Sequence, residues 1–152
     1  MQRHTRTIPP KVAAALARFK GKEAALIFPT GYSANVGTIA GLMRSGRTRL
    51  ADSQNQSNSL ESRFDLAYNA AHALSLAALR RLGYRAENRY IVFQVLPHAL
   101  ALGPAVWRVL AKCHEVRNLG EYEGDLNIDE RLVADLITAC KAVVAALEKL
   151  RA

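Results

Sequence analysis

The polar side chains between His114 and Gly124 form the densest group of potential ligand-binding residues in this chain of 152 residues. Arg117 carries a fixed positive charge, and the amide of Asn118 both donates and accepts hydrogen bonds. His114 lies three residues before Arg117, so on a helix the two side chains share a face. This combination favours recognition of a phosphate group or a nucleobase.

The same residues also have a purely structural interpretation. Arg117 can pair with Glu121 one helical turn later, and the helix can end at Gly120. Tyr122 can donate a hydrogen bond or stack on a base, or it can close the end of a helical bundle as a half-buried aromatic residue. The sequence leaves both interpretations open.

Positive charge is concentrated in the first third of the chain. Residues 1–49 contain nine Lys or Arg and a single acidic residue, Glu23, which gives a net charge of +8. Residues 50–152 contain 12 basic and 12 acidic residues, so their net charge is zero. We therefore expect a basic N-terminal extension over 1–49 and a separate domain over 50–152, with the boundary near 45–47 and the polar run 52–59.

The remaining composition limits the class of protein. Cys113 and Cys140 are too few and too far apart for a disulfide framework or a thiolate metal site. They are expected to be buried thiols in a reducing cytosol, with a bridge between them as the alternative. No apolar run reaches the roughly 18 residues of a membrane span, and the N-terminus lacks the apolar core of a secretory signal. We expect a cytoplasmic protein without a metal site.

The spacing of apolar residues predicts mostly helices. The N-terminal part predicts a helix over 12–19, a strand over 24–28, a turn over 29–31 and a helix over 33–43. The later part predicts helices over about 58–82, over 87–96, from 103 to the polar cluster, and from 127 to 150. Short connections between them indicate an all-α fold, an antiparallel bundle of four to five helices after an irregular or partly helical extension.

Particular residues predict where these helices begin and end. Asn58 and Asn127 are each followed three residues later by a glutamate, which is typical of a capping box. Pro97 is expected to end the second helix of the bundle, and Pro104 is expected to lie in the first turn of the third.

Residues 16–43 resemble part of the large domain of the α-oxoamine synthases, which are pyridoxal-phosphate enzymes that condense amino acids with acyl-CoA. The resemblance rests on Leu16-Ala17-Arg18-Phe19 and on the run from Gly21 to Asn35. In that family the positions matching Thr30, Gly31 and Tyr32 lie at the cofactor. The Schiff-base lysine and the other cofactor residues of the family lie far downstream, and nothing after Met43 continues the pattern. We therefore expect no bound cofactor, and a pyridoxal-phosphate-dependent acyltransferase fragment is an alternative.

Residues 58–151 resemble the HEPN superfamily. The resemblance rests on the run Ser62-Arg63-Phe64-Asp65-Leu66-Ala67-Tyr68-Asn69-Ala70-Ala71-His72 and on Arg117-Asn118 near the end of a later helix. HEPN proteins are small helical bundles, commonly dimers, that bind or cut RNA or accompany minimal nucleotidyltransferases as toxin–antitoxin partners. The resemblance implies an RNA or nucleotide ligand, an antitoxin or nucleotidyltransferase partner, and a homodimer. Phe64, Tyr68 and Trp107 are available for the dimer interface.

The catalytic HEPN pattern is incomplete in this chain. Catalytic members have an arginine, a polar residue and then a histidine a few positions later. Arg117 and Asn118 match the first two positions, but Tyr122, Glu123 and Gly124 stand where the histidine is expected. Metal-independent RNA cleavage needs a group that exchanges protons near neutral pH, and tyrosine, with an ordinary pKa of about 10, does this poorly.

We therefore expect a binding module rather than an enzyme, with His114, Arg117, Asn118 and Tyr122 as its nucleic-acid-binding residues. The alternative is a weak metal-independent endoribonuclease. In that case Arg117 would hold the phosphate, because arginine cannot transfer its proton, and His114 or Tyr122 would act as the proton-transfer group. A histidine near a helix end otherwise serves as a surface or capping residue.

Overall fold

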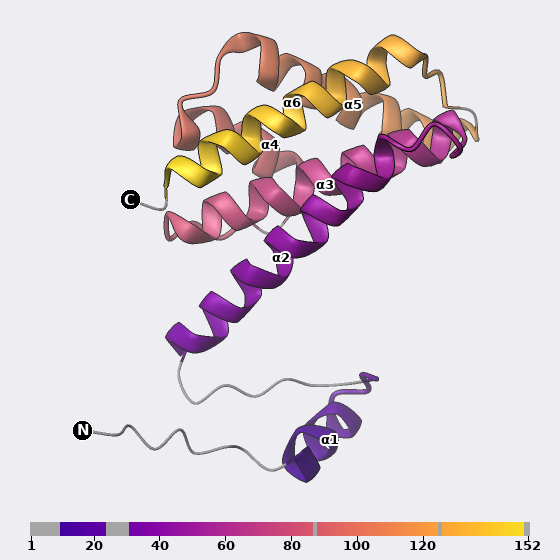
Figure 1. The fold of residues 1–152 in the computed structure, drawn as a ribbon. Helices are drawn as coiled ribbons and strands as arrows, with labels where there is room; N and C mark the ends of the chain where they lie inside the picture. The colour runs from indigo at the N-terminus through magenta and orange to yellow at the C-terminus, as the bar shows by residue number, and fades with distance from the viewer. Residues whose placement is uncertain (1–9, 24–30, 87, 125, 151–152) are drawn as a thin grey trace. The chain divides into compact units, whose positions relative to one another are not determined.

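The computed structural model describes residues 10–23, 31–86, 88–124 and 126–150, and within these ranges it contains helices and no strands. The helices are α1 (Pro10–Phe19), α2 (Gly31–Ser53), α3 (Leu60–Arg81), α4 (Arg89–Leu100), α5 (Pro104–Glu123) and α6 (Glu130–Lys149) (Figure 1). The all-α prediction is confirmed for the described residues. The predicted strand over 24–28 and Thr30 lie outside them.

The chain divides into two compact units, residues 1–38 and residues 39–152. In the first unit α1 confirms the helix predicted over 12–19, and it ends where Lys22 N donates to Ala17 O at 2.9 Å. The second unit holds the bundle. The expected division after residue 49, which rests on charge, stays a prediction, but Ser45, Gly46 and Arg47 lie inside α2 rather than in a connection.

Four helices of the second unit, α3 to α6, surround the main apolar core. α3 contacts α4 and α6, and α5 contacts the same two helices (Figure 1). Phe64 and Tyr68 of α3 are almost completely buried in this core, so the expectation that they form a dimer interface is wrong, whereas Trp107 is 40% exposed. Phe64 and Tyr68 instead serve packing within one chain.

The second half of α2 joins this core through one buried face. Its buried residues are Met43, Gly46, Leu50 and Ser53, spaced three or four positions apart. A Cβ atom added at Gly46 would lie 2.6 Å from Leu74 Cγ of α3, so only glycine permits this approach of the two helices. α2 is therefore longer than the helix predicted over 33–43, because its polar second half still has an apolar stripe.

A buried arginine joins the ends of three helices. Arg63 of α3, whose side chain is 5% exposed, donates from Nε to Ser53 O of α2 at 3.1 Å. Its Nη1 donates to both carboxylate oxygens of Glu130 in α6, at 2.9 and 3.0 Å. These bonds satisfy a charged group that would be costly to bury alone.

Two predicted helix starts are shifted by one or two residues. The N-cap of α3 is Ser59 rather than Asn58, because Ser59 Oγ accepts from Ser62 N at 3.2 Å while Asn58 Nδ2 donates to Asp52 O. The N-cap of α6 is Asp129 rather than Asn127, and its carboxylate accepts from Leu132 N at 2.7 Å. Both caps use a short side-chain oxygen, as helix starts require.

Two predicted helix ends are also corrected. α4 continues past Pro97 to Leu100 and ends at Ala101, which adopts the left-handed conformation with φ of 50°. α5 continues past Gly120 and ends at Gly124, whose φ of 73° suits glycine. Proline lacks an N–H, but a proline near a helix end removes only one bond of the ladder, and the final turn of α4 tolerates this.

The two cysteines are free and buried, as expected. Burial raises the pKa of both Cys113 and Cys140 to about 12, so both thiols stay protonated at neutral pH. Cys140 Sγ donates to Ala67 O of α3 at 3.3 Å. Among the described residues, none of the helices is long and apolar enough to cross a membrane.

Candidate functional site

Two arginines meet at one amide oxygen where α3, α4 and α5 come together. Arg89 Nη1 of α4 and Arg117 Nη1 of α5 both donate to Asn69 Oδ1 of α3, each at 3.3 Å. Asn69 Nδ2 donates to Asp65 O at 2.9 Å, which fixes the amide so that its oxygen faces the guanidinium groups. An uncharged acceptor therefore holds two positive charges close together.

The ring of Tyr68 supports both arginines. Arg117 Cζ lies 4.7 Å and Arg89 Cζ 5.7 Å from the centroid of this ring, within the range of cation–π interactions. Burial raises the pKa of Tyr68 above its ordinary value, so the phenol keeps its proton at neutral pH. The buried aromatic ring restricts where the two guanidinium groups can lie.

Carboxylates neutralise one arginine more than the other. Arg117 pairs with Glu121 at 3.2 Å and lies 3.6 Å from Asp65 Oδ1. The structural interpretation of the sequence is thus confirmed for the Arg117–Glu121 pair. Within the described part of the chain, Arg89 has no carboxylate within 4.0 Å. Among the described residues, Arg117 is thus the more neutralised of the two guanidinium groups.

His114 connects the arginine pair with Asn118. Its Nδ1 lies 2.7 Å from Tyr68 Oη, and its Nε2 lies 3.1 Å from Asn118 Nδ2. Because an amide nitrogen only donates, Nε2 accepts this bond, and the ring proton lies on Nδ1 and is donated to Tyr68 Oη. Burial, followed by the charges of Arg117 and Arg89, lowers the pKa of His114. The imidazole is therefore uncharged at pH 7.

The structure brings together three of the four predicted site residues. His114 and Asn118 are hydrogen-bonded to each other, and Arg117 joins them through Tyr68, to which His114 is bonded and over whose ring Arg117 lies. Tyr122 is 90% exposed, which excludes the interpretation that it closes the bundle end as a half-buried residue, and no bond joins it to this group among the described residues. Of the positions that match the cofactor segment of the α-oxoamine synthases, Gly31 and Tyr32 begin α2, and the side chain of Tyr32 lies outside the described part.

The sequence placed Tyr68 at a dimer interface, and it identified neither Asn69 nor Arg89 as a site residue. The available signal was a polar residue beside an aromatic residue on an otherwise apolar helix face. Asn69 accepts from Arg89 and Arg117, which lie 20 and 48 residues further along the chain. Such pairing depends on how helices pack and leaves no local pattern.

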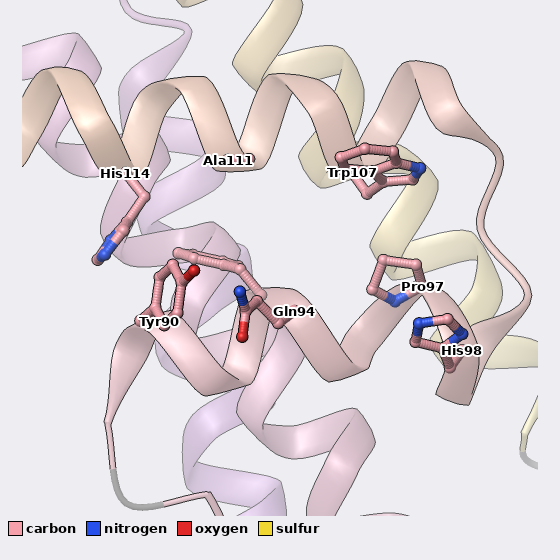
Figure 2. Close-up of a pocket in the computed structure, with 8 residues that line it drawn as sticks. Tyr90, Gln94, Pro97, His98, Trp107, Ala111 and His114 are labelled. Carbon is pink, nitrogen blue, oxygen red and sulfur yellow. The ribbon is translucent and has the colours of Figure 1, made fainter.

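A cavity lies next to this group, between α4 and α5. Its volume is about 590 Å³, and Figure 2 shows side chains from both helices around it. It is lined by Tyr90, Phe93, Gln94, Pro97, His98, Trp107, Ala111 and His114. A smaller hollow of about 340 Å³ lies on the other side of Arg117, beside Asp65 and Glu121. His114 belongs to both the cavity and the bonded group.

The residues present do not fit a pyridoxal-phosphate site. A Schiff-base lysine is normally shielded from water, which keeps its amine reactive. All six lysines of this chain lie in the described ranges, and each is exposed: Lys11, Lys20, Lys22, Lys112, Lys141 and Lys149. In the same ranges no group of His, Cys, Asp and Glu side chains is arranged to hold a metal ion.

Comparison with curated proteins gives short matches to one enzyme, 8-amino-7-oxononanoate synthase. The chain is 47% identical over 47 residues to the enzyme of Pseudomonas aeruginosa, which is 31% of this chain and 12% of that protein. It is 39% identical over 88 residues to the enzyme of Pseudomonas putida, which is 54% of this chain and 22% of that protein. It is 44% identical over 48 residues to the enzyme of Halorhodospira halophila, or 32% of this chain and 12% of that protein.

These matches are partial. The chain covers less than a quarter of each of these synthases, so they indicate a shared segment and not a shared active site. No protein-family model matches the chain. No solved structure matches it either.

Proposed function

We propose that this protein is a HEPN-like helical module that binds RNA or a nucleotide through its phosphate, and that it does so without catalysis. The observation that carries the proposal is the meeting of Arg89 and Arg117 at Asn69 Oδ1. Guanidinium groups are well suited to phosphate oxygens because they present several donors in a fixed plane. The partly exposed amide of Asn118 adds a donor and an acceptor beside them.

The HEPN resemblance supports the rest of this proposal. It favours a role in a toxin–antitoxin or nucleotidyltransferase-linked system, with an antitoxin or nucleotidyltransferase protein as partner and a second copy of the chain in a homodimer. Tyr122 fits this function as an exposed ring on which a base can stack, one turn beyond Asn118 on α5.

The state of His114 supports binding over cleavage. A general acid in RNA cleavage must carry a proton to the leaving oxygen. Protonation of His114 is opposed by burial, by two nearby arginines and by the hydrogen bond that Nε2 accepts from the Asn118 amide. The weak endoribonuclease remains the second candidate, because an uncharged His114 beside Arg117 can still accept a proton as a base. Asn118 would then have to move away from Nε2.

The short matches to 8-amino-7-oxononanoate synthase favour one further candidate, a fragment of a pyridoxal-phosphate-dependent acyltransferase. The exposure of all six lysines argues against it, because no shielded amine is available to hold the cofactor covalently.

The test is binding of mixed-sequence single-stranded RNA to the full chain, compared with Arg89→Ala, Arg117→Ala and Arg85→Ala. Loss of a charge-assisted phosphate contact is expected to weaken binding on the order of tenfold or more for the first two variants. Arg85→Ala removes the same charge from an exposed position in the connection before α4, so it is the matched control and should bind as wild type does. Denaturing gels of the same samples report cleavage.

The basic N-terminal segment can bind nucleic acid without specificity, but it is identical in all four proteins and its contribution falls as salt is raised. Equal affinities in all four proteins would contradict the proposed site. Cleavage by wild type that His114→Ala abolishes would establish the endoribonuclease instead.

A further inference from the structure

The cavity between α4 and α5 has walls that the fold leaves uncovered. Tyr90 is 56% exposed and Trp107 is 40% exposed, whereas Phe64, Tyr68 and Phe93 are buried in the core. Figure 2 shows Tyr90 and Gln94 on α4 and Trp107, Ala111 and His114 on α5 around this space. A volume of about 590 Å³ lies within the range typical of small-molecule sites.

The polar groups of the cavity are few and are placed around flat rings. Gln94 is an exposed amide on the cavity wall, and it offers a donor and an acceptor side by side. Such an amide can bond two neighbouring atoms on the edge of a nucleobase. Aromatic and proline surfaces on either side favour a planar ligand, because bases stack on aromatic rings irrespective of their identity.

His114 lies between the cavity and the arginine pair, since it lines the cavity and its Nδ1 contacts Tyr68, whose ring both arginines cover. His114 lines the cavity, its ring centroid lies 5.8 Å from that of Tyr90, and it is bonded to Asn118. On α5, Trp107, Ala111, His114 and Asn118 are spaced by three or four residues, so they follow one face of the helix over about 16 Å. On α4, Arg89 directly precedes Tyr90.

We infer that the cavity and the arginine pair together bind one nucleotide unit, with the base between Tyr90 and Trp107 and the phosphate at Arg89. This inference rests on the proposed function and deepens it by assigning the base. His114, at the junction, then lies beside the sugar. The nucleotide can be a free monophosphate or one unit of single-stranded RNA, since both present the same base and phosphate.

The natural reporter of this site is Trp107, which is the only tryptophan of the chain. The experiment titrates the full protein with each of the four ribonucleoside monophosphates, with the corresponding nucleosides, with inorganic phosphate, and with single-stranded RNA, while tryptophan fluorescence is measured. Stacking on Trp107 is expected to quench its emission with at least one monophosphate. Inorganic phosphate alone should leave the emission unchanged. If the monophosphates quench the emission and RNA does not, the ligand is the free nucleotide.

Two variants test the two halves of the site. Arg89→Ala should weaken the binding of the quenching monophosphate on the order of tenfold. Arg85→Ala is the matched control, and its affinity should be unchanged. Ala111→Phe fills the cavity from an exposed helix position, so it should remove quenching without unfolding the bundle, which the circular dichroism of the variant verifies.

The outcomes separate this inference from the proposed function. Two results would show that the base is not in the cavity, and only the inference would then fail. In the first, RNA binding depends on Arg89 and Arg117, but neither a monophosphate nor RNA quenches Trp107. In the second, Ala111→Phe binds RNA as wild type does. If neither RNA nor any nucleotide binds in an arginine-dependent manner, the proposed function fails and the inference fails with it.

Discussion

Two histidines near the arginine pair are uncharged at neutral pH for the same physical reason. His72 of α3 and His114 of α5 are both partly buried, and both face the positive charges of Arg89 and Arg117. Burial is the larger cause in each case, and the arginines add to it. For His72 the result is a pKa lowered to about 4. The residues that hold a phosphate would thus also make the bundle sensitive to acid.

The lowered pKa of His72 makes the stability of the fold depend on pH. The folded-state pKa of His72 lies below the ordinary histidine value of about 6.5, so the unfolded chain binds this proton more tightly. The contribution of uncharged His72 to the free energy of unfolding is complete above pH 6.5 and is lost as the pH falls toward 4. We expect the free energy of unfolding, measured by urea unfolding, to fall by about 1 kcal/mol between pH 7 and pH 5 from this group alone, less than the full shift implies because solvent screens a partly exposed side chain.

His72→Gln provides the control, because glutamine has no charge to gain. His114 acts in the same direction, so the variant should keep a smaller pH dependence. An identical pH dependence in wild type and His72→Gln would show that His72 is not held uncharged by the fold.

At the residue scale the sequence predicted one side of the site. His114, Arg117 and Asn118 lie within five residues on one helix, so helical spacing alone places them together. Asn69 and Arg89 reach the site from other helices, and their contribution depends on a crossing that no local pattern encodes. Tyr122 was predicted because it stands where the HEPN pattern has a histidine, but one turn beyond Asn118 on α5 its side chain is 90% exposed.

At the scale of single helices, the packing of α2 on α3 depends on one glycine. Glycine lowers helix stability by about 1 kcal/mol relative to alanine, so its presence inside α2 needs a reason. At Gly46 the reason is Leu74, whose Cγ would lie 2.6 Å and whose Cδ2 would lie 3.0 Å from an added Cβ. The gain in helix propensity competes directly with a steric clash in the core.

We predict that Gly46→Ala destabilises the protein by about 1–3 kcal/mol, because α2 must move away from α3 or Leu74 must leave its rotamer. The melting temperature measured by circular dichroism checks this. Gly41→Ala is the matched control, since Gly41 lies in the same helix and an added Cβ there meets nothing within 4 Å. That variant should be neutral or more stable by up to about 1 kcal/mol. Equal effects at both positions would contradict the close packing.

Helix positions were predictable and helix ends were less so. Apolar residues at helical spacing located all four helices of the main bundle, because this spacing follows directly from burial of one face. The ends depended on which of several neighbouring polar side chains makes the capping bond. Ser59 rather than Asn58 caps α3, because the Asn58 amide donates to Asp52 O instead. Which side chain makes the capping bond therefore depends on residues on both sides of the turn.

At the scale of the whole molecule, the bundle leaves several large apolar side chains exposed. Ile91 of α4 is 40% exposed and Leu119 of α5 is 49% exposed. Solvent-exposed apolar groups remain available for contact with another protein, which buried ones are not. They are a better basis for the proposed homodimer than Phe64 and Tyr68, which the core already uses.

We predict that the full chain, of 16.7 kDa, sediments with twice this mass, and that Leu119→Arg returns it to the mass of a single chain. A charge placed in an apolar interface loses its hydration without gaining a partner. Leu82→Arg, at an exposed position in the connection after α3, is the control and should remain dimeric. A wild-type protein that sediments at 16.7 kDa would contradict the proposal of a homodimer.

The least predictable part of the molecule was the region around residues 39–53. Its basic and polar composition favoured an extension separate from the bundle, yet Met43 and Leu50 belong to the apolar core. A narrow apolar stripe on a helix with many polar residues gives a weak signal. The packing becomes apparent only when α3 supplies the opposing surface.

The four buried positions of α2, residues 43, 46, 50 and 53, also constrain how this gene can change. Each additional residue in an α-helix turns everything beyond it by about 100°. Insertion or deletion of one residue between Arg47 and Leu50 would rotate Leu50 and Ser53 out of the core while Met43 and Gly46 stayed in it. Length variants within α2 should therefore be tolerated only in steps near whole turns.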